Sequence, residues 1–138
     1  MRIMAIDYGD AHTGIAISDP TGFLAGYTTV INAYRPEVVA DRIAALIAEY
    51  GVEELVLGHP INMDGSRGPR SEKAHAMKAL LEERTSLPVV MWDERRTTID
   101  AHQILFNSGK NAKQRKKVVD AVAASLILEG YLTFKKNH

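Results

Sequence analysis

The chain has 138 residues, which is enough for one hydrophobic core, and we expect a single domain over residues 1–138. Apolar residues make up 46% and charged residues 25% of the chain, which excludes disordered and fibrous proteins. Because there is no cysteine, disulfides, thiol nucleophiles and cysteine-ligated zinc are excluded as well. No apolar run is long enough to span a membrane, and no signal peptide is recognisable before Asp7, so we expect a cytoplasmic protein.

Positive and negative charges are equal in number but unevenly placed. The 17 basic and 17 acidic side chains give a net charge of zero. Residues 1–109 carry 10 basic and 15 acidic side chains, whereas residues 110–138 carry 7 basic and 2 acidic ones. This asymmetry favours a polyanionic partner for the basic segment, and the alternative is a solvated tail and loop.

Three strands are predicted at the start of the chain. Arg2–Asp7 and Gly14–Asp19 are apolar runs joined by a short turn that contains Gly9, which is typical of an antiparallel hairpin. A third strand is predicted within Leu24–Ile31, where β-branched and aromatic residues follow a turn. The fold is therefore expected to open with a meander.

Helices and strands alternate in the rest of the chain. Apolar residues recur with a helical period from Pro36 until Gly51. The further elements expected are a strand at Leu55–Gly58, a helix at Pro69–Arg84, a strand at Val89–Trp92, a helix from Thr97 to about Leu105 and a last, largely apolar helix from about Lys117. The order β-β-β-α-β-α-β-α-α predicts an α/β fold in which a mixed β-sheet is flanked by α-helices, with the last helix packed centrally.

Three carboxylates lie where packing alone does not explain them: Asp7 at the end of the first strand, Glu94 after the fifth, and Asp120 in the first turn of the last helix. The carboxyl ends of parallel strands form the ligand crevice of such sheets, so Asp7 and Glu94 converge there if the first and fifth strands are neighbours. Clustered carboxylates hold a cation between them, and oxygen ligands suit Mg²⁺ or Mn²⁺. The ordinary alternatives are a turn at Asp7, an ion pair of Glu94 with Arg95 or Arg96, and a helix-dipole contact of Asp120.

Several segments carry groups that can bind phosphate. Asp7-Tyr-Gly9 followed by Gly14 is a candidate phosphate-cradling loop, because glycines let backbone amides approach an anion, although this pattern is unspecific. The connection Gly58–Gly68 and the residues after it offer hydrogen-bond donors at Asn62, Ser66, Arg67 and Arg70. A basic run precedes Asp120, which favours a nucleic-acid backbone over a small neutral substrate. Its members are Lys110, Lys113, Arg115, Lys116 and Lys117.

Five motifs together identify a family. They are Asp7-Tyr-Gly9, Gly14-Ile-Ala-Ile-Ser-Asp19, Gly58-His-Pro-Ile-Asn-Met-Asp-Gly65, Asp93-Glu-Arg-Arg-Thr-Thr98, and Asp120-Ala-Val-Ala-Ala124 with Ile127-Leu128. In order and spacing they resemble the bacterial YqgF family, also called RuvX. The resemblance covers essentially the whole chain, and the blocks at 93–98 and 120–124 are its most specific parts.

The resemblance implies a ribonuclease H-like fold and a metal-dependent nuclease, a hydrolase acting on ester bonds. Such a nuclease is related to Holliday junction resolvases and linked to maturation of the small-subunit ribosomal RNA precursor. The resemblance also implies Asp7, Glu94 and Asp120 as catalytic and metal-binding residues, with Mg²⁺ or Mn²⁺ as cofactor. The expected substrate-binding residues are Arg95 and Thr97 together with Lys113, Arg115, Lys116 and Lys117. We expect nucleic acid as the partner, no membrane, and a monomer or weak homodimer.

Three other functions are open at this point. The first is cleavage of branched DNA, for which a resolvase needs a symmetric dimer. The second is a non-catalytic RNA-binding module that uses the basic run. The third is an ATP-binding protein of the sugar-kinase and actin superfamily, which has a similar Asp-x-Gly pattern in its first strand but needs two such domains.

Overall fold

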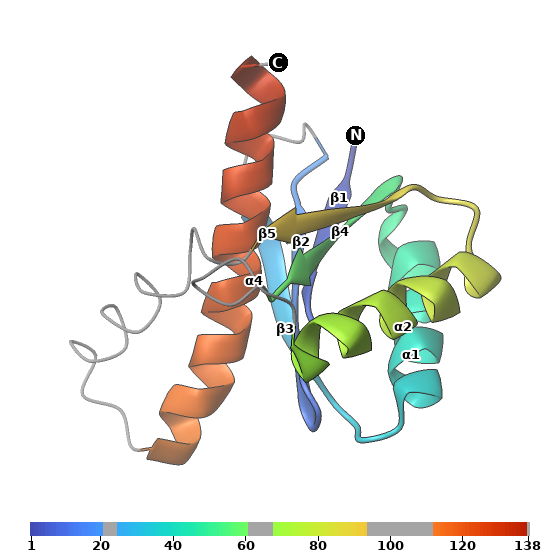
Figure 1. Cartoon of the computed structure of the whole chain (residues 1–138). Coiled ribbons are helices and arrows are strands. Elements are labelled where there is room, and N and C mark those ends of the chain that lie inside the picture. Colours follow the sequence, from blue (N-terminus) through green and yellow to red (C-terminus); the bar gives the residue numbers. More distant parts are fainter. Residues whose placement is uncertain (21–24, 61–67, 94–111, 138) are drawn as a thin grey trace.

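The computed structural model describes residues 1–20, 25–60, 68–93 and 112–137, and at residues 25, 112–120 and 137 it describes the backbone alone (Figure 1). Its strands are β1 (Ile3–Asp7), β2 (His12–Ser18), β3 (Ala25–Asn32), β4 (Glu54–His59) and β5 (Val89–Asp93). Its helices are α1 (Pro36–Tyr50), α2 (Pro69–Arg84) and α4 (Ala112–Asn137). The helix expected from Thr97 lies outside the described residues.

The strands form one five-stranded mixed sheet in the order β3-β2-β1-β4-β5. The pairs β1/β2 and β2/β3 are antiparallel, as the predicted meander requires. The pairs β1/β4 and β4/β5 are parallel. Helix α1 carries the chain back from β3 to the start of β4, and α2 carries it back from β4 to the start of β5. The expected mixed sheet is thereby confirmed, but β1 and β5 are not neighbours, since β4 lies between them.

Local sequence signals account for the ends of the first two helices. Both begin at a proline, which suits the first helical turn because its missing N–H would have no partner there. Helix α1 ends at Gly51, whose left-handed backbone (φ 67°) is the conformation that glycine adopts without strain. The predicted bounds of α2 and the predicted end of α1 are therefore confirmed.

Helix α4 begins at Ala112, five residues before the predicted start near Lys117. The charge of the basic run favours a loop. Its alanine, lysine, glutamine and arginine residues are nevertheless good helix formers, and no glycine or proline interrupts them. The run from Lys113 to Lys117 therefore forms the first turns of α4.

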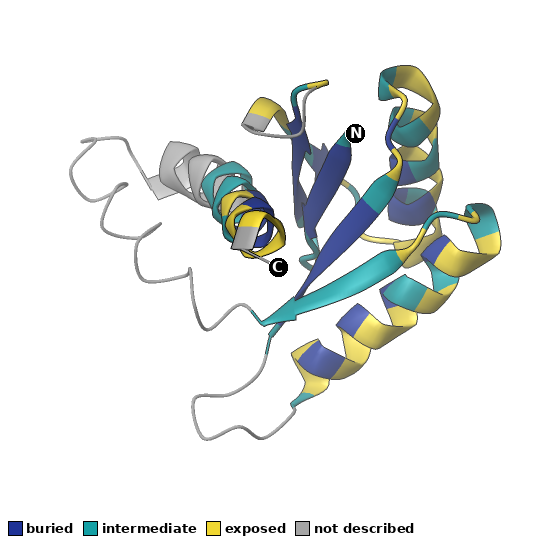
Figure 2. Cartoon of the chain, turned by 90° about the horizontal axis from the view of Figure 1, so that it is seen from above, coloured by how far each residue is buried: buried dark blue, intermediate teal, exposed yellow. Residues whose placement is uncertain are grey.

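Helices cover both faces of the sheet, as seen from above in Figure 2. Helices α1 and α2 pack on one face over a core that includes Met4, Ile6, Ile15, Leu57 and Met77. On the other face α4 is the covering helix in the described part of the chain, and its contacts run across β1 to β4. The buried residues of that second core are Ile3, Ala5, Ala16, Val56, Ala124, Ile127, Leu128, Tyr131 and Leu132.

Helix α4 is apolar because one side of it fills this second core, while Glu129 and Thr133 are exposed on the other side. It lies on one face of the sheet rather than in the middle of the molecule. None of the described helices is long and apolar enough to cross a membrane.

Candidate active site

The parallel strands β1, β4 and β5 end at one edge of the sheet, which we call the carboxyl edge. The register pairs Ile6 with Leu57 and Gly58 with Trp92. Continued by one residue, the β1/β4 register places Gly58 beside Asp7. Asp7, Gly58 and Trp92 thus form one row across the three strands.

The carboxylate of Asp7 belongs to the face that α4 covers. Side chains alternate along a strand, and the side chains of Ile3 and Ala5 are buried under α4, so Asp7 follows on the same face. Its cross-strand neighbours on that face are Gly14 of β2 and Gly58 of β4. Neither glycine carries a side chain, so neither directly opposite residue places a side chain against the half-buried Asp7.

The direction of α4 is set by two contacts with Glu54 at the start of β4. The Tyr131 hydroxyl donates a hydrogen bond to Glu54 Oε1 at 3.1 Å, and Lys135 Nζ contacts Glu54 Oε2 at 2.9 Å. Burial, followed by the nearby Glu54 charge, raises the pKa of Tyr131 to about 12, so the phenol stays a neutral donor. The carboxy-terminal part of α4 therefore lies at the amino ends of the parallel strands.

This direction brings the backbone of residue 120 toward the carboxyl edge. Residue 120 precedes Tyr131 by eleven positions, or about 16 Å of helix. On β1 the residue paired with Glu54 is Ile3, and Asp7 lies four residues, or about 13 Å, beyond it. The two lengths are similar, so residue 120 and Asp7 lie at nearly the same level. Residue 120 also precedes Ala124 by one helical turn and Ile127 by two, so it shares the helix face that meets the sheet.

The other predicted site residues lie outside what the structure describes. Strand β5 ends at Asp93, directly before Glu94, and residues 94–111, with Arg95 and Thr97, are not described. Because β4 separates β1 from β5, Asp7 and the end of β5 are two strand spacings apart, about 10 Å. The first and fifth strands are therefore not the neighbours that this route to convergence required, and the meeting of Asp7 with Glu94 stays a prediction.

Within the described residues no group of three or more histidine, aspartate or glutamate side chains could hold a metal ion. Only Asp7 of the three predicted metal-binding acids has a described side chain. The donor set expected here, carboxylate oxygens at a strand edge beside two glycines, suits a hard divalent cation. The side chains of Lys113, Arg115, Lys116 and Lys117 are likewise not described, although their backbone forms the start of α4.

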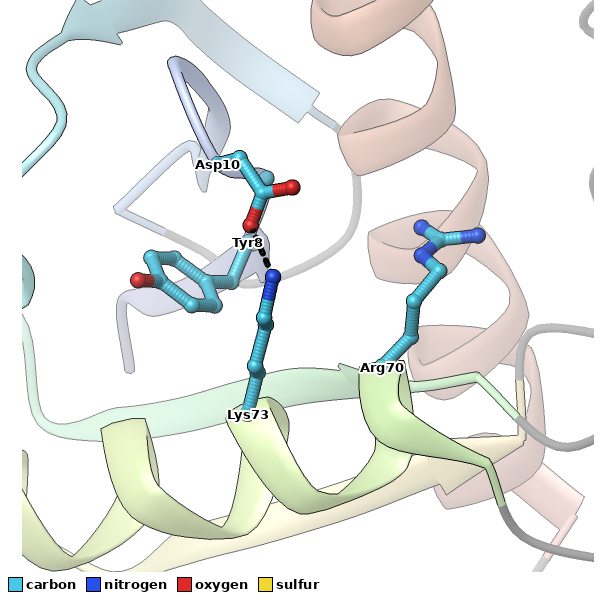
Figure 3. A pocket seen from close by; sticks show the side chains of 5 residues that line it. Tyr8, Asp10, Arg70 and Lys73 are labelled. Atoms are coloured by element: carbon cyan, nitrogen blue, oxygen red, sulfur yellow. Dashed lines mark hydrogen bonds and ion pairs between the residues drawn. The ribbon is translucent and has the colours of Figure 1, made fainter.

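A pocket opens at the carboxyl edge on the opposite face from Asp7, and we call it the edge pocket (Figure 3). It is an open depression of about 240 Å³, a volume that includes solvent at its mouth. It is lined by Tyr8, Gly9, Asp10, Arg70 and Lys73. Lys73 Nζ lies 2.7 Å from Asp10 Oδ1. The hydrogen bond and charge of Lys73 hold the pKa of the Asp10 carboxyl below its usual value.

Sequence reasoning found part of this pocket and missed the rest. Arg70 is one of the predicted phosphate-binding residues, and it lies in the first turn of α2, within the predicted helix. Lys73 and Asp10 were missed. The three-residue spacing of Arg70 and Lys73 at the start of a helix was the available signal, because it puts both on one helix face.

A buried hydrogen bond attaches the first turn of α2 to the end of β4. His59 Nε2 and Ser71 Oγ lie 2.6 Å apart, and both residues are buried. The His59 ring also packs edge-on against His75, with centroids 4.8 Å apart. These contacts position the helix turn that carries Arg70 and Lys73.

Comparisons with known proteins agree on one family. The model of the family described as "RuvX: Holliday junction resolvase" matches residues 1–134. A protein of Halothermothrix orenii named "Putative pre-16S rRNA nuclease" is 46% identical over 135 residues, which is 98% of this chain and 96% of that protein.

Two solved structures have the same fold. The structure described as "T. thermophilus RuvC in complex with Holliday junction substrate" has a TM-score of 0.65 at 12% identity, and covers 99% of this chain and 96% of its own. The fowlpox virus Holliday junction resolvase has a TM-score of 0.60 at 16% identity, with 97% and 99% covered. The expected ribonuclease H-like fold is confirmed, and the chain belongs to the RuvX family.

Proposed function

We propose that this protein is a divalent-metal-dependent endonuclease that hydrolyses phosphodiester bonds in the precursor of 16S ribosomal RNA. The observation that carries the proposal is the position of Asp7. It ends β1, the central strand of the five-stranded sheet, faces α4, and has glycines as its neighbours on both adjacent strands. The name of the relative from Halothermothrix orenii supports the choice of substrate.

Asp7, Glu94 and Asp120 are the proposed ligands of Mg²⁺ or Mn²⁺. Such ions, when bound, supply Lewis acidity for attack on a phosphodiester. Residue 120 lies on the sheet-facing side of α4 near the level of Asp7, which supports a shared site for these two acids. Glu94 is included because it directly follows the last residue of β5, at the same edge.

The substrate is proposed to lie across the carboxyl edge. Lys113, Arg115, Lys116 and Lys117 belong to the first turns of α4, and Arg95 and Thr97 follow β5 in sequence. The five cations among these residues would hold the phosphates of the chain being cut, and the Thr97 hydroxyl would hydrogen-bond there. Processing of a ribosomal RNA precursor would take place in the cytoplasm, and single-strand cleavage needs only a monomer.

Cleavage of branched DNA is the second candidate function. It is favoured by the likeness to the RuvC structure solved with a Holliday junction substrate, at a TM-score of 0.65. At 12% identity this likeness concerns the fold, so we rank RNA cleavage first.

The test is incubation of the pure protein with precursor 16S ribosomal RNA and with four-way DNA junctions, each with and without Mg²⁺ or Mn²⁺. We expect cleavage of the RNA only with a metal ion. Asp7→Asn, Glu94→Gln and Asp120→Asn should each lower the cleavage rate by at least about 100-fold, because each removes a charged metal ligand.

Glu49→Gln is the matched control, since it neutralises one exposed carboxylate on α1 and should cut at the wild-type rate. Preferential cleavage of the four-way DNA junction would show that branched DNA, and not the RNA precursor, is the substrate. RNA binding without any cleavage would favour a non-catalytic module, and unchanged cutting by Asp7→Asn would refute the proposed site.

A further inference from the structure

We propose that the edge pocket, formed by Tyr8, Gly9, Asp10, Arg70 and Lys73, binds a backbone phosphate of the nucleic-acid substrate. This phosphate would lie near the phosphodiester that is hydrolysed at Asp7, on the same nucleic-acid strand. The inference rests on the proposed function, since it assigns a further binding site for the same substrate.

The charge of the edge pocket fits a single phosphodiester. Arg70 and Lys73 bring two positive charges and Asp10 one negative charge, which leaves one net positive charge. Arg70 is exposed and forms no ion pair with any other residue in the described ranges. Lys73 extends from α2 to Asp10 in the turn after β1, whereas Arg70 extends from the start of α2 with its guanidinium apart from that ion pair (Figure 3).

The ion pair between Lys73 and Asp10 is open to exchange. The side chains of Lys73 and Asp10 are 51% and 76% exposed, and ion pairs at such exposed positions are weak. A phosphate that enters between Arg70 and Lys73 can therefore take the place of the Asp10 carboxylate. Asp10 then acts as an internal competitor that lowers the affinity of the pocket.

The edge pocket is close to the proposed catalytic centre. Tyr8 directly follows Asp7, and Asp10 is three positions beyond Asp7, so the Cα atoms of Asp7 and Asp10 are at most about 11 Å apart. Asp7 faces α4, whereas Tyr8 packs with the core under α1 and α2. A nucleic-acid strand that crosses the carboxyl edge would therefore meet both sites.

Contacts within the chain position the backbone on both sides of the pocket. A Cβ atom on Gly9 would collide with the carbonyl oxygen of His12, so the turn on one side of the pocket requires glycine. On the other side, the buried contact of Ser71 with His59 holds the helix turn between Arg70 and Lys73. Such ordering lowers the entropic cost of binding a phosphate.

The test measures binding of a short fluorescein-labelled single-stranded RNA by anisotropy, in Mg²⁺, with Asp7→Asn in every protein to prevent cleavage. Arg70→Gln and Lys73→Gln should each weaken binding by about 3- to 10-fold and reduce the slope of log K against log salt by about 0.7. Asp10→Asn should strengthen binding by about 2-fold or more, because it frees Lys73.

Arg42→Gln on α1 and Lys78→Gln further along α2 are matched controls that remove one positive charge away from the carboxyl edge, and both should bind as the parent does. Circular dichroism melts should show that all these proteins are folded. The inference is overturned if Arg70→Gln and Lys73→Gln bind with the parent's affinity and salt slope, or if the parent does not bind the RNA.

Cleavage assays in the wild-type background separate this inference from the proposed function. If both hold, Arg70→Gln and Lys73→Gln raise KM and leave kcat near the wild-type value. If cleavage is insensitive to both substitutions, the proposed nuclease activity stands and phosphate binding in the edge pocket is refuted. If RNA binding depends on Arg70 and Lys73 but the protein never cuts, phosphate binding in the edge pocket stands and the nuclease activity is refuted.

Discussion

At the scale of single residues, two motif glycines, Gly14 and Gly58, lie on either side of Asp7 in the sheet. Gly14 was considered as part of a phosphate-cradling loop, but it lies within β2, directly opposite Asp7. Gly58 has the equivalent place on β4. Neither residue paired with Asp7 across the sheet therefore places a side chain beside the group proposed to bind metal.

Asp10 gives a pH-dependent prediction at the same scale. Because Lys73 lowers its folded-state pKa below the usual value of 3.8, the stabilisation from this pair is complete above that value and decreases as pH falls through the lower, folded-state pKa. An NMR titration of the Asp10 carboxyl should therefore give a midpoint below 3.8 in the wild type. In Lys73→Gln the midpoint should move up toward 3.8, and an unchanged midpoint would contradict the ion pair.

At the scale of elements, the contact of α4 with β5 links two distant parts of the chain. Trp92, the single tryptophan, packs edge-on against Tyr131 and Phe134 of α4, with ring centroids 5.8 Å from each. Gly130 lies against the same indole, and a Cβ placed there would be 3.3 Å from Trp92 Cζ2. Gly130 thus permits α4 to approach the row that contains Asp7 and Gly58.

Substitution of Gly130 tests this packing. Gly130→Val should push α4 away from Trp92 and lower the free energy of unfolding by about 1–3 kcal/mol, since extra methyl groups do not fit a packed contact. Tryptophan fluorescence reports the change directly, because Trp92 is the only indole, and its emission should shift to the red.

Gly130→Ala serves as the graded comparison for that experiment. Its smaller side chain needs the indole to move only slightly, and alanine favours the helix by about 1 kcal/mol. Its stability should therefore lie above that of Gly130→Val. Equal stability of the wild type and Gly130→Val would show that α4 does not pack closely on Trp92.

At the scale of the whole molecule, the first turns of α4 bring a run of basic residues to the carboxyl edge. Helix α4 is long enough that its first turns extend past the carboxyl edge (Figure 1), because Lys113 precedes Tyr131 by eighteen residues, about 27 Å, whereas β1 reaches Asp7 in about 13 Å. Arg70 and Lys73 lie at the same edge. The zero net charge therefore conceals a concentration of basic residues where the substrate is proposed to bind.

Neutralising the start of α4 tests this arrangement. Replacing Lys113, Arg115, Lys116 and Lys117 by glutamine should weaken RNA binding by at least about 10-fold. The slope of log K against log salt should decrease by about 0.7 for each phosphate contact that is lost. The control is Lys135→Gln with Lys136→Gln, at the opposite end of the same helix, which should leave the affinity and its salt dependence nearly unchanged. If both variants bind equally weakly, the attraction comes from net charge and not from the carboxyl edge.

The sequence by itself determined the order of the described elements, the bounds of α2 and the family. These depend on short-range patterns, namely the period of apolar residues, the prolines that begin α1 and α2, and motifs of a few adjacent residues. The same patterns identified Asp7 as a carboxylate at a strand end. They misplaced the start of α4, because charge suggested a loop where helix propensity was high.

Only the tertiary structure decided which residues meet. The insertion of β4 between β1 and β5, the glycines on both sides of Asp7, and the pairing of Lys73 with Asp10 across 63 residues all depend on how elements pack. The β-strand period specifies which face a side chain takes, but it does not specify which strand lies beside it. Contacts between distant segments follow from burial of the whole core, which is why the edge pocket could not be read from the sequence.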